Sequence, residues 1–249
     1  MAGHSKWANT KHRKAAVDAK RGKVFTRLGK EITVAARMGG GDVDANPRLR
    51  TAVNKARADN MPMDNIKRAI QRGTGEIPGV VYEEIVYEGY GPGGVALYME
   101  VTTDNRNRTV GEIRHALSKN GGNMGENGCV AWMFHKKGII TVEAEGVSED
   151  ALMDAALSAG AEDMELQDDV YQITTEPGDC ETVVEALRAA GFTPQDDEIR
   201  MVPDNEVKLE GKDAERMIRL MEVLEDHDDI QSVSANFDIP DEILERLLG

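Results

Sequence analysis

Hydrophobic residues recur every three or four positions through the first third of the chain, which is the period of amphipathic α-helices. The first such pattern runs from about residue 9 to residue 38, with a break expected near Gly22, and three glycines end it. Asn46 and Pro47 indicate the start of a second helix, and Asp64 is expected to cap a third helix that stops at Gly73. Residues 1–75 are therefore predicted to form an all-helical domain.

From residue 80 onward the hydrophobic pattern changes to alternation, which is typical of β-strands. Segments 80–88 and 95–102 are predicted strands, and Thr109 and Glu112 have the spacing of a capping box at the start of the next helix. A short strand is expected at 129–134, followed by a link at 135–138. The sequence then predicts the order strand, helix, strand, strand, helix, strand up to about residue 201, which is the ferredoxin-like arrangement.

The last segment, from about residue 204, supplies strands and helices but too few strands for a sheet of its own. It is expected to complete the domain that the segment 80–135 begins. The predicted fold class is α+β multidomain, with a basic all-helical N-terminal domain and two α/β, ferredoxin-like domains, the third inserted into the second. The predicted borders are 1–75, 76–136 plus 202–249, and 137–201.

Charge is divided unevenly between the two parts of the chain. Residues 1–75 hold 17 Lys or Arg against 6 Asp or Glu, whereas the remaining residues hold 13 against 39. A surface of one sign repels itself, so binding to a polyanion explains the basic segment better than a merely solvated helix face. The first cations along the chain are candidate phosphate contacts: Lys6, Lys11, Arg13, Lys14, Lys20, Arg21 and Lys23.

The predicted insert at 137–201 has the opposite character, with 17 Asp or Glu against 3 Lys or Arg. We expect it to avoid nucleic acid, and to contact protein or act as a spacer. In the basic arm, Trp7 has two interpretations, a ring that stacks on a base or an apolar anchor that packs the arm onto its own domain. An aromatic content of 4% argues against a broad base-stacking platform.

A second candidate anion site lies at residues 105–108, directly before the predicted helix. Arg106, Arg108 and the amides of Asn105 and Asn107 would lie beside the positive end of the helix dipole, where a phosphate is favoured. The alternative is a polar turn whose arginines pair with neighbouring carboxylates. Spacing by itself does not decide between the two interpretations.

Catalytic, metal and cofactor sites are not indicated. The five histidines lack metal-ligand spacing, and no Ser or Cys lies in a nucleophile-elbow motif. The enzymatic alternative is a metal-dependent nuclease that uses Asp104, Glu112 and Glu126. No segment approaches the roughly 18–20 apolar residues of a membrane span, and two cysteines are too few for a disulfide framework, so we expect a cytoplasmic protein.

Several long motifs occur in order over about the first 135 residues: GHSKWANTKHRKAAVDAKRGK, GGGDVDANPRLR, NMPMDNIKRAI, YEGYGPGG, TDNRNRT and VAWMF. These motifs closely resemble the YebC family, which includes the mitochondrial translational activator of cytochrome oxidase. The resemblance implies three domains with the third inserted into the second, and no enzymatic activity. The positions that it carries over are Lys6, Trp7, Lys11, His12, Arg13 and Lys14 in the arm, and Asn105, Arg106, Asn107 and Arg108 before the helix.

The resemblance also implies one of two functions, DNA-binding transcriptional regulation or a ribosome-associated translation factor that relieves stalling at proline-rich stretches. The sequence contains no clear recognition helix and no symmetric dimer seam, which favours RNA over DNA. We therefore expect a non-enzymatic nucleic-acid-binding regulator whose partner is ribosomal RNA or DNA, with the ribosome as the first interpretation. A protein-interaction adaptor that uses the acidic insert is the further alternative.

Overall fold

The computed structural model describes residues 17–167, 169–240 and 243–244, with side chains from residue 22 onward. The first part is a bundle of three helices, which we call the helical bundle. Ile32, Leu49 and Ile66 are fully buried at its centre, one from each helix. The bundle consists of α2 (Val17–Gly39), α3 (Pro47–Ala58) and α4 (Met63–Thr74).

Helix starts in the bundle follow local chemistry in part. Asn46 caps α3 as expected, because its side chain accepts a hydrogen bond from the Leu49 amide. The expected break near Gly22 is wrong, since α2 continues through this residue, and a single helical glycine costs only about 1 kcal/mol. The expected cap at Asp64 is also wrong: α4 begins one residue earlier, after Pro62, and Asp64 lies in its first turn.

The close contact of α2 with α4 depends on Gly73. A Cβ at this position would lie 2.4 Å from the backbone oxygen of Thr33 and 2.7 Å from Ala36 Cβ. We expect Gly73→Ala to lower the free energy of unfolding by about 1–3 kcal/mol, because one of the two backbones must move. Gly22→Ala is the matched control, since its Cβ would meet nothing within 4 Å. That control is expected to stabilise α2 by about 0.5–1 kcal/mol.

Urea unfolding of the two variants measures the difference directly. Equal effects of Gly73→Ala and Gly22→Ala would contradict a tight α2–α4 contact.

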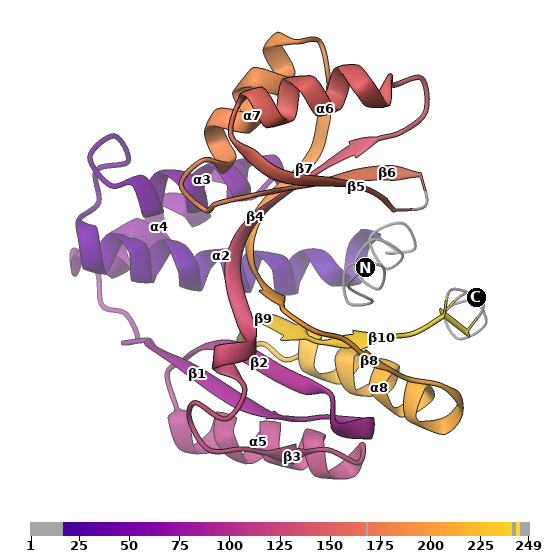
Figure 1. Cartoon of the computed structure of the whole chain (residues 1–249). Coiled ribbons are helices and arrows are strands. Elements are labelled where there is room, and N and C mark those ends of the chain that lie inside the picture. The colour runs from indigo at the N-terminus through magenta and orange to yellow at the C-terminus, as the bar shows by residue number, and fades with distance from the viewer. Residues whose placement is uncertain (1–16, 168, 241–242, 245–249) are drawn as a thin grey trace.

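A second part, which we call the central lobe, is a four-stranded antiparallel sheet with two helices on one face (Figure 1). The strand order is β3-β1-β2-β9, so a strand from near the C-terminus pairs with β2 and completes the sheet. Leu97, Ile113 and Met217 are fully buried between the sheet and its helices. The elements are β1 (Glu83–Tyr90), β2 (Ala96–Thr103), α5 (Arg106–Lys119), β3 (Asn123–Met124), α8 (Gly211–Glu225) and β9 (Ile230–Ala235).

Two 3-10 turns and a pair of short strands flank this sheet. A 3-10 turn at Pro92–Gly94 connects β1 with β2, and another at Ala131–Met133 precedes the next long strand. A small parallel pair joins β8 (Val207–Lys208) to β10 (Phe237–Asp238).

The third part, the insert lobe, has the strand order β5-β6-β4-β7, with neighbouring strands antiparallel. This is the sheet of the ferredoxin-like arrangement that the sequence predicts. Ile140, Ile173 and Val183 are fully buried beneath its helices. The elements are β4 (Phe134–Glu143), α6 (Glu149–Ser158), β5 (Ala161–Gln167), β6 (Val170–Thr175), α7 (Cys180–Ala189) and β7 (Pro194–Pro203).

The connection between these two lobes is a two-stranded ribbon, not the link expected at 135–138. Those residues belong to β4, which pairs with β7 from Phe134 opposite Pro203 onward, whereas β6 joins β4 only from Gly138. Both strands run unbroken across the predicted borders at 136–137 and 201–202. Residues 135–137 are all polar and carry no hydrophobic alternation, so cross-strand pairing with β7, and not a local pattern, extends the strand through them.

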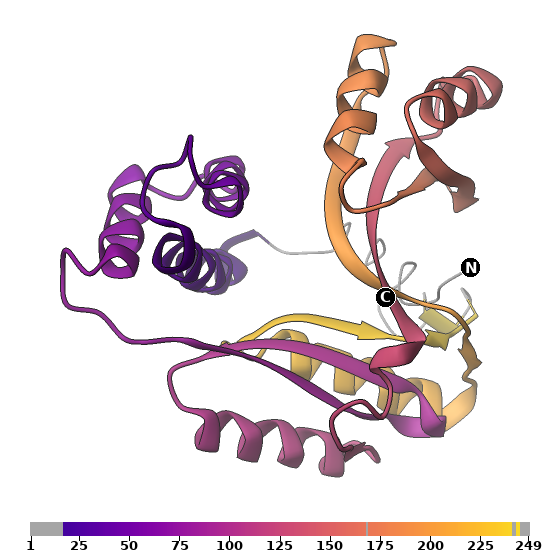
Figure 2. The same cartoon turned by 60° about the vertical axis from the view of Figure 1, so that its left-hand side comes forward.

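The helical bundle stands to one side of the two lobes. In Figure 1, α2 lies at a height between the insert lobe above and the central lobe below, and Figure 2 shows the ribbon rising from the central lobe with the bundle beside it. No helix within the described ranges is long and apolar enough to cross a membrane.

Candidate nucleic-acid interface

Most of the basic arm lies outside the described residues, so its predicted contacts stay predictions. The arm candidates Lys6, Trp7, Lys11, His12, Arg13 and Lys14 are in this group. The backbone of Lys20 and Arg21 lies in the first turns of α2, and their side chains are outside the described part.

One face of α2 docks on the turn that follows α8. Lys23 Nζ lies 2.5 Å from Asp226 Oδ2, and the Arg27 guanidinium donates to the carbonyl oxygens of Glu225 and His227. These carbonyls stand at a helix C-terminus, where the dipole favours cations. Lys23, a predicted nucleic-acid contact, therefore pairs with an acid of the same chain. This ion pair is largely exposed to solvent.

Seven residues after Lys23, Lys30 enters the buried centre of this contact. Its ammonium group donates to Asp229 Oδ1 at 2.5 Å and to the carbonyl oxygens of Asp228 at 2.9 Å and Thr102 at 3.3 Å. All three ammonium hydrogens therefore have acceptors, which a buried charge requires. The side chains of Lys30 and Asp229 are 8% and 5% exposed.

Asp229 is the centre of a cluster that joins the bundle to the central lobe. Its Oδ2 accepts hydrogen bonds from Thr109 at 2.6 Å, Arg108 at 2.7 Å and Thr103 at 3.1 Å. We call these residues, with Lys30, the Asp229 cluster. Burial by itself would raise the pKa of the Asp229 carboxyl, but the hydrogen bonds from Lys30, Thr109 and Arg108 hold that pKa well below its usual range.

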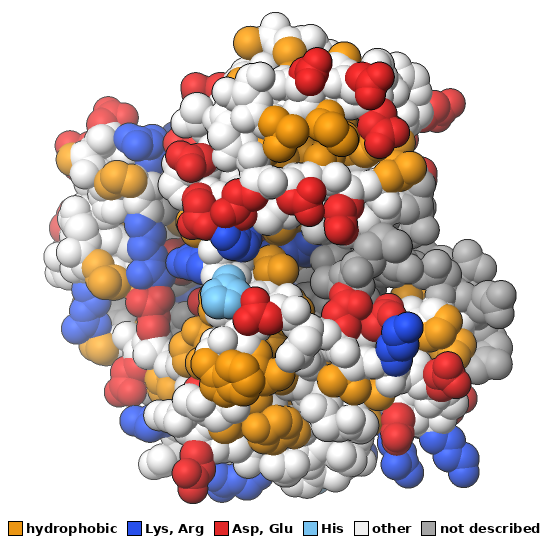
Figure 3. Space-filling model, viewed as in Figure 1, with side chains coloured by type: hydrophobic (Ala, Val, Ile, Leu, Met, Phe, Trp, Pro, Cys, Tyr) orange, Lys and Arg blue, Asp and Glu red, His pale blue; other side chains and the backbone are white. Residues whose placement is uncertain are grey.

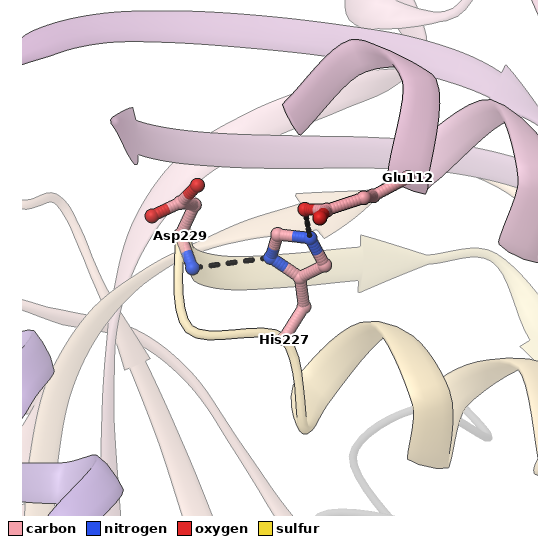
Figure 4. A group of neighbouring side chains, drawn as sticks. All are labelled: Glu112, His227 and Asp229. Atoms are coloured by element: carbon pink, nitrogen blue, oxygen red, sulfur yellow. Dashed lines mark hydrogen bonds and ion pairs between the residues drawn. The ribbon is translucent and has the colours of Figure 1, made fainter. Parts of the chain in front are cut away.

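Three potential metal ligands lie together beside this cluster. Glu112, His227 and Asp229 place potential ligand atoms within 4.8 Å of one another, and Figure 4 shows them converging from α5 and the turn before β9. The imidazole Nδ1 accepts the Asp229 amide at 3.1 Å, and Nε2 lies 3.0 Å from Glu112. Both ring nitrogens thus have partners, and two cations already neutralise Asp229, so the geometry fits a hydrogen-bond network better than a divalent ion.

Of the two interpretations of residues 105–108, the turn with carboxylate-paired arginines holds for Arg108. Helix α5 begins at Arg106, not at Thr109, because the Asn105 side chain accepts the Arg108 amide as the cap. Arg108 pairs with Asp229 and, at 3.0 Å, with Asp104, which is the carboxylate-paired alternative. Arg106 and Asn107 are exposed, with no side-chain hydrogen bond or ion pair within the described ranges. Their predicted contact with a phosphate remains open to test.

A further group of unpaired cations lies on the exposed faces of α3 and α4. Their side chains are exposed and make no side-chain hydrogen bond or ion pair with any described residue, and Figure 3 shows blue groups along the side of the molecule that these helices occupy. Opposite charges lie above them on the insert lobe, where red groups dominate. On these two helices, the exposed cations that make no hydrogen bond or ion pair with a described residue are Lys55, Arg57, Lys67, Arg68 and Arg72.

Sequence reasoning did not find the Asp229 cluster. In the sequence, Lys30 does not differ from the other cations of the basic segment, and Asp229 does not differ from its neighbours Asp226 and Asp228. The seven-residue spacing from Lys23 to Lys30 places both on one helix face, and this was the available signal.

The fold and the charge distribution define a class of protein: a multidomain α+β protein in which a basic helical bundle is docked on an acidic two-lobed body. Comparison with known proteins gives the particular family. Residues 5–76 match the model described as the TACO1/YebC protein N-terminal domain, and residues 82–237 match the TACO1/YebC second and third domain. The chain belongs to the TACO1/YebC family.

Relatives of similar length carry regulatory names. A "probable transcriptional regulatory protein" of Koribacter versatilis is 60% identical over 249 residues, covering 100% of both chains. Another of that name, from Desulforapulum autotrophicum, is 57% identical and covers 99% of this chain and 100% of its own. A crystal structure of a conserved hypothetical protein from Aquifex aeolicus matches with a TM-score of 0.83 and 47% identity, covering 93% of this chain and 96% of that one.

Proposed function

We propose that this protein is a non-enzymatic, nucleic-acid-binding regulator of gene expression that acts on the ribosome and relieves stalling at proline-rich stretches. The observation that carries the binding role is the separation of charge, 17 Lys or Arg against 6 Asp or Glu in residues 1–75 and 13 against 39 beyond them. The resemblance to translation factors of this family supports the ribosome as the site of action.

The docked bundle explains how the cations would serve this role. Lys23, Arg27 and Lys30 hold α2 on the central lobe. The positions of α3 and α4, which pack on α2, are thereby fixed relative to the central lobe, and so are their exposed cations such as Lys55 and Lys67. Phosphates that bind these side chains release counterions, which supplies affinity without sequence specificity. The basic arm, with Lys11, Arg13 and Lys14, would extend this surface.

A DNA-binding transcriptional regulator is the second candidate function. The observation in its favour is the name of the relatives, "probable transcriptional regulatory protein". Both candidates use phosphate contacts, so affinity for a polyanion does not separate them. A third candidate, a protein-interaction adaptor, rests on the acidic insert lobe and predicts partner binding that survives charge reversal in the arm.

Co-sedimentation with ribosomes across a salt series tests the proposal, with promoter-length DNA as competitor. We expect saturable binding that DNA does not displace. The variant K11E/R13E/K14E is expected to lose it, because three favourable contacts become repulsive.

Binding that DNA displaces in full, with a steep salt dependence, would contradict ribosome specificity and favour the DNA-binding regulator. Unchanged binding by the triple variant would favour the adaptor. A matched control, K119E/K208E/K212E, reverses three exposed lysines of the central lobe and is expected to bind as the wild type does.

A further inference from the structure

A groove of about 650 Å³ lies where the C-terminal ends of α2 and α4 meet the chain that leads into β1. We call it the α2–α4 groove. Arg37 and Arg72, each in the last turn of its helix, both line it. Met38, Val80, Val81 and Tyr82 contribute the apolar part of its wall.

Two glycines explain why the arginines converge there. Gly73 allows the α4 backbone to approach α2 between Thr33 and Arg37, which brings the two helix ends together. Gly79 then lets the connecting chain pass beneath Arg72, since a Cβ there would lie 3.0 Å from Arg72 Cβ. The aliphatic part of the Arg72 side chain therefore lies against Gly79, and its guanidinium group lies at the groove.

Both guanidinium groups are available to a ligand. Neither makes a hydrogen bond or ion pair with any described residue, and the acid in the groove wall, Glu84, is already paired with Arg48 at 2.5 Å. Arg68 lies one turn before Arg72 on the same face of α4 and is also unpaired within the described ranges. Like charges at this spacing destabilise a helix, and an anion bound nearby would reduce that repulsion.

The apolar rim of the groove restricts the kind of anion that fits. Met38, Val80 and Val81 are 71%, 53% and 56% exposed, so three large apolar side chains adjoin the two arginines in water. A free phosphate would leave this rim uncovered. A nucleotide within a strand covers it with its sugar or base while its phosphate takes the guanidinium hydrogens.

We infer that the α2–α4 groove binds one nucleotide of an RNA strand, with its phosphodiester between Arg37 and Arg72 and its sugar or base against Met38, Val80 and Val81. This inference rests on the proposed function and adds a defined contact to it. The groove would hold the RNA at a defined position on the bundle, next to the last of the α4 cations Lys67, Arg68 and Arg72.

Binding of fluorescein-labelled rU12 and dT12 by the full chain tests this assignment, with R37Q/R72Q compared against K212Q/R219Q. The control pair removes two exposed cations from α8. We expect R37Q/R72Q to weaken rU12 binding by about 10- to 100-fold and to reduce the salt slope by about 0.7, the value for one phosphate of a single strand. The control is expected to change neither value.

A second variant, V80S/V81S, keeps both arginines and the hydrogen bond from Arg48 to Met38 Sδ. It is expected to weaken rU12 binding at an unchanged salt slope, because it removes apolar contact alone. Circular dichroism melting of each variant confirms that the bundle is folded. Unchanged rU12 binding by R37Q/R72Q would overturn the groove, and so would a loss confined to dT12 or displacement of rU12 by a poly-glutamate peptide.

Failure of the groove and failure of the proposed function are distinguishable in the same preparations. If R37Q/R72Q binds rU12 and ribosomes as the wild type does, the groove assignment falls and the proposed function stands. If the wild type binds neither, both fall.

Discussion

Replacing Asp229 by alanine is expected to lower the free energy of unfolding by about 3–5 kcal/mol, the usual cost of removing one partner of a buried ion pair. Lys30 would keep its charge at a site where its side chain is 8% exposed, with two carbonyl oxygens as its remaining acceptors. The hydroxyl groups of Thr103 and Thr109 would also lose a carboxylate acceptor. Urea unfolding with a fixed m-value measures the loss.

The matched control is Asp226→Ala, which breaks the Lys23 ion pair on the same turn. The side chains of Lys23 and Asp226 are 41% and 69% exposed, so the free energy of unfolding is expected to fall by less than about 1 kcal/mol. Equal losses in the two variants would contradict the central position of Asp229. The double variant D229A/K30M is expected to recover part of the loss, because no buried charge is then left without a partner.

Lowering the pH is expected to reduce the free energy of unfolding that the Asp229 cluster contributes. The hydrogen bonds from Lys30, Thr109 and Arg108 outweigh burial and hold the folded-state pKa of Asp229 below its unfolded value, which is about 3.9. The stabilisation is therefore fully present above about pH 4 and is lost as pH falls further, through the folded-state pKa. The stability difference between wild type and D229A should be constant from about pH 7 to pH 5 and should shrink below about pH 4.

Glu88→Gln is expected to cost about 2–3 kcal/mol, although it preserves side-chain volume. Glu88 is a buried carboxylate on β1, and its oxygens accept the backbone amides of Gly128 at 2.6 Å and of Val130 and Ala131 at 2.7 Å. Glutamine would place a donor group opposite at least one of these amides, which would leave a buried N–H without an acceptor. Thermal and urea unfolding give the measurement.

The same residue should affect the position of the insert lobe, because the turn that Glu88 holds leads directly into β4 and the ribbon. Amide hydrogen exchange at 128–134 is expected to increase in E88Q. The control is Glu83→Gln on the same strand, an exposed position where a change within about 0.5 kcal/mol is expected. A similar small change in E88Q would contradict the role of the three amide bonds.

The pH dependence of Glu88 has the same sign as that of Asp229. Burial would raise the pKa of this carboxyl, but the three backbone amides outweigh it and lower the pKa. Its contribution is therefore expected above the unfolded-state pKa and is lost as pH falls through the folded-state value.

The sequence by itself determined the elements whose signals are local. Helical period and turn glycines predicted the three helices of the bundle, and the strand and helix order predicted the ferredoxin-like insert sheet β5-β6-β4-β7. Counting charge along the chain showed that the bundle is basic, and the motifs resembled the family that the comparisons confirm. The division into three domains with borders at 75, 136 and 201 remains a prediction.

Tertiary structure decided which polar groups face water and which face one another. Lys23, Lys30 and Arg108 look alike in sequence to Lys55 and Lys67, yet the first three pair with acids that lie about 120 to 200 residues away. Likewise, Arg37 and Arg72 share a groove because Gly73 lets two helices meet. Partners at such separations are set by packing of the whole chain, and local sequence patterns contain information only about neighbours within a few residues.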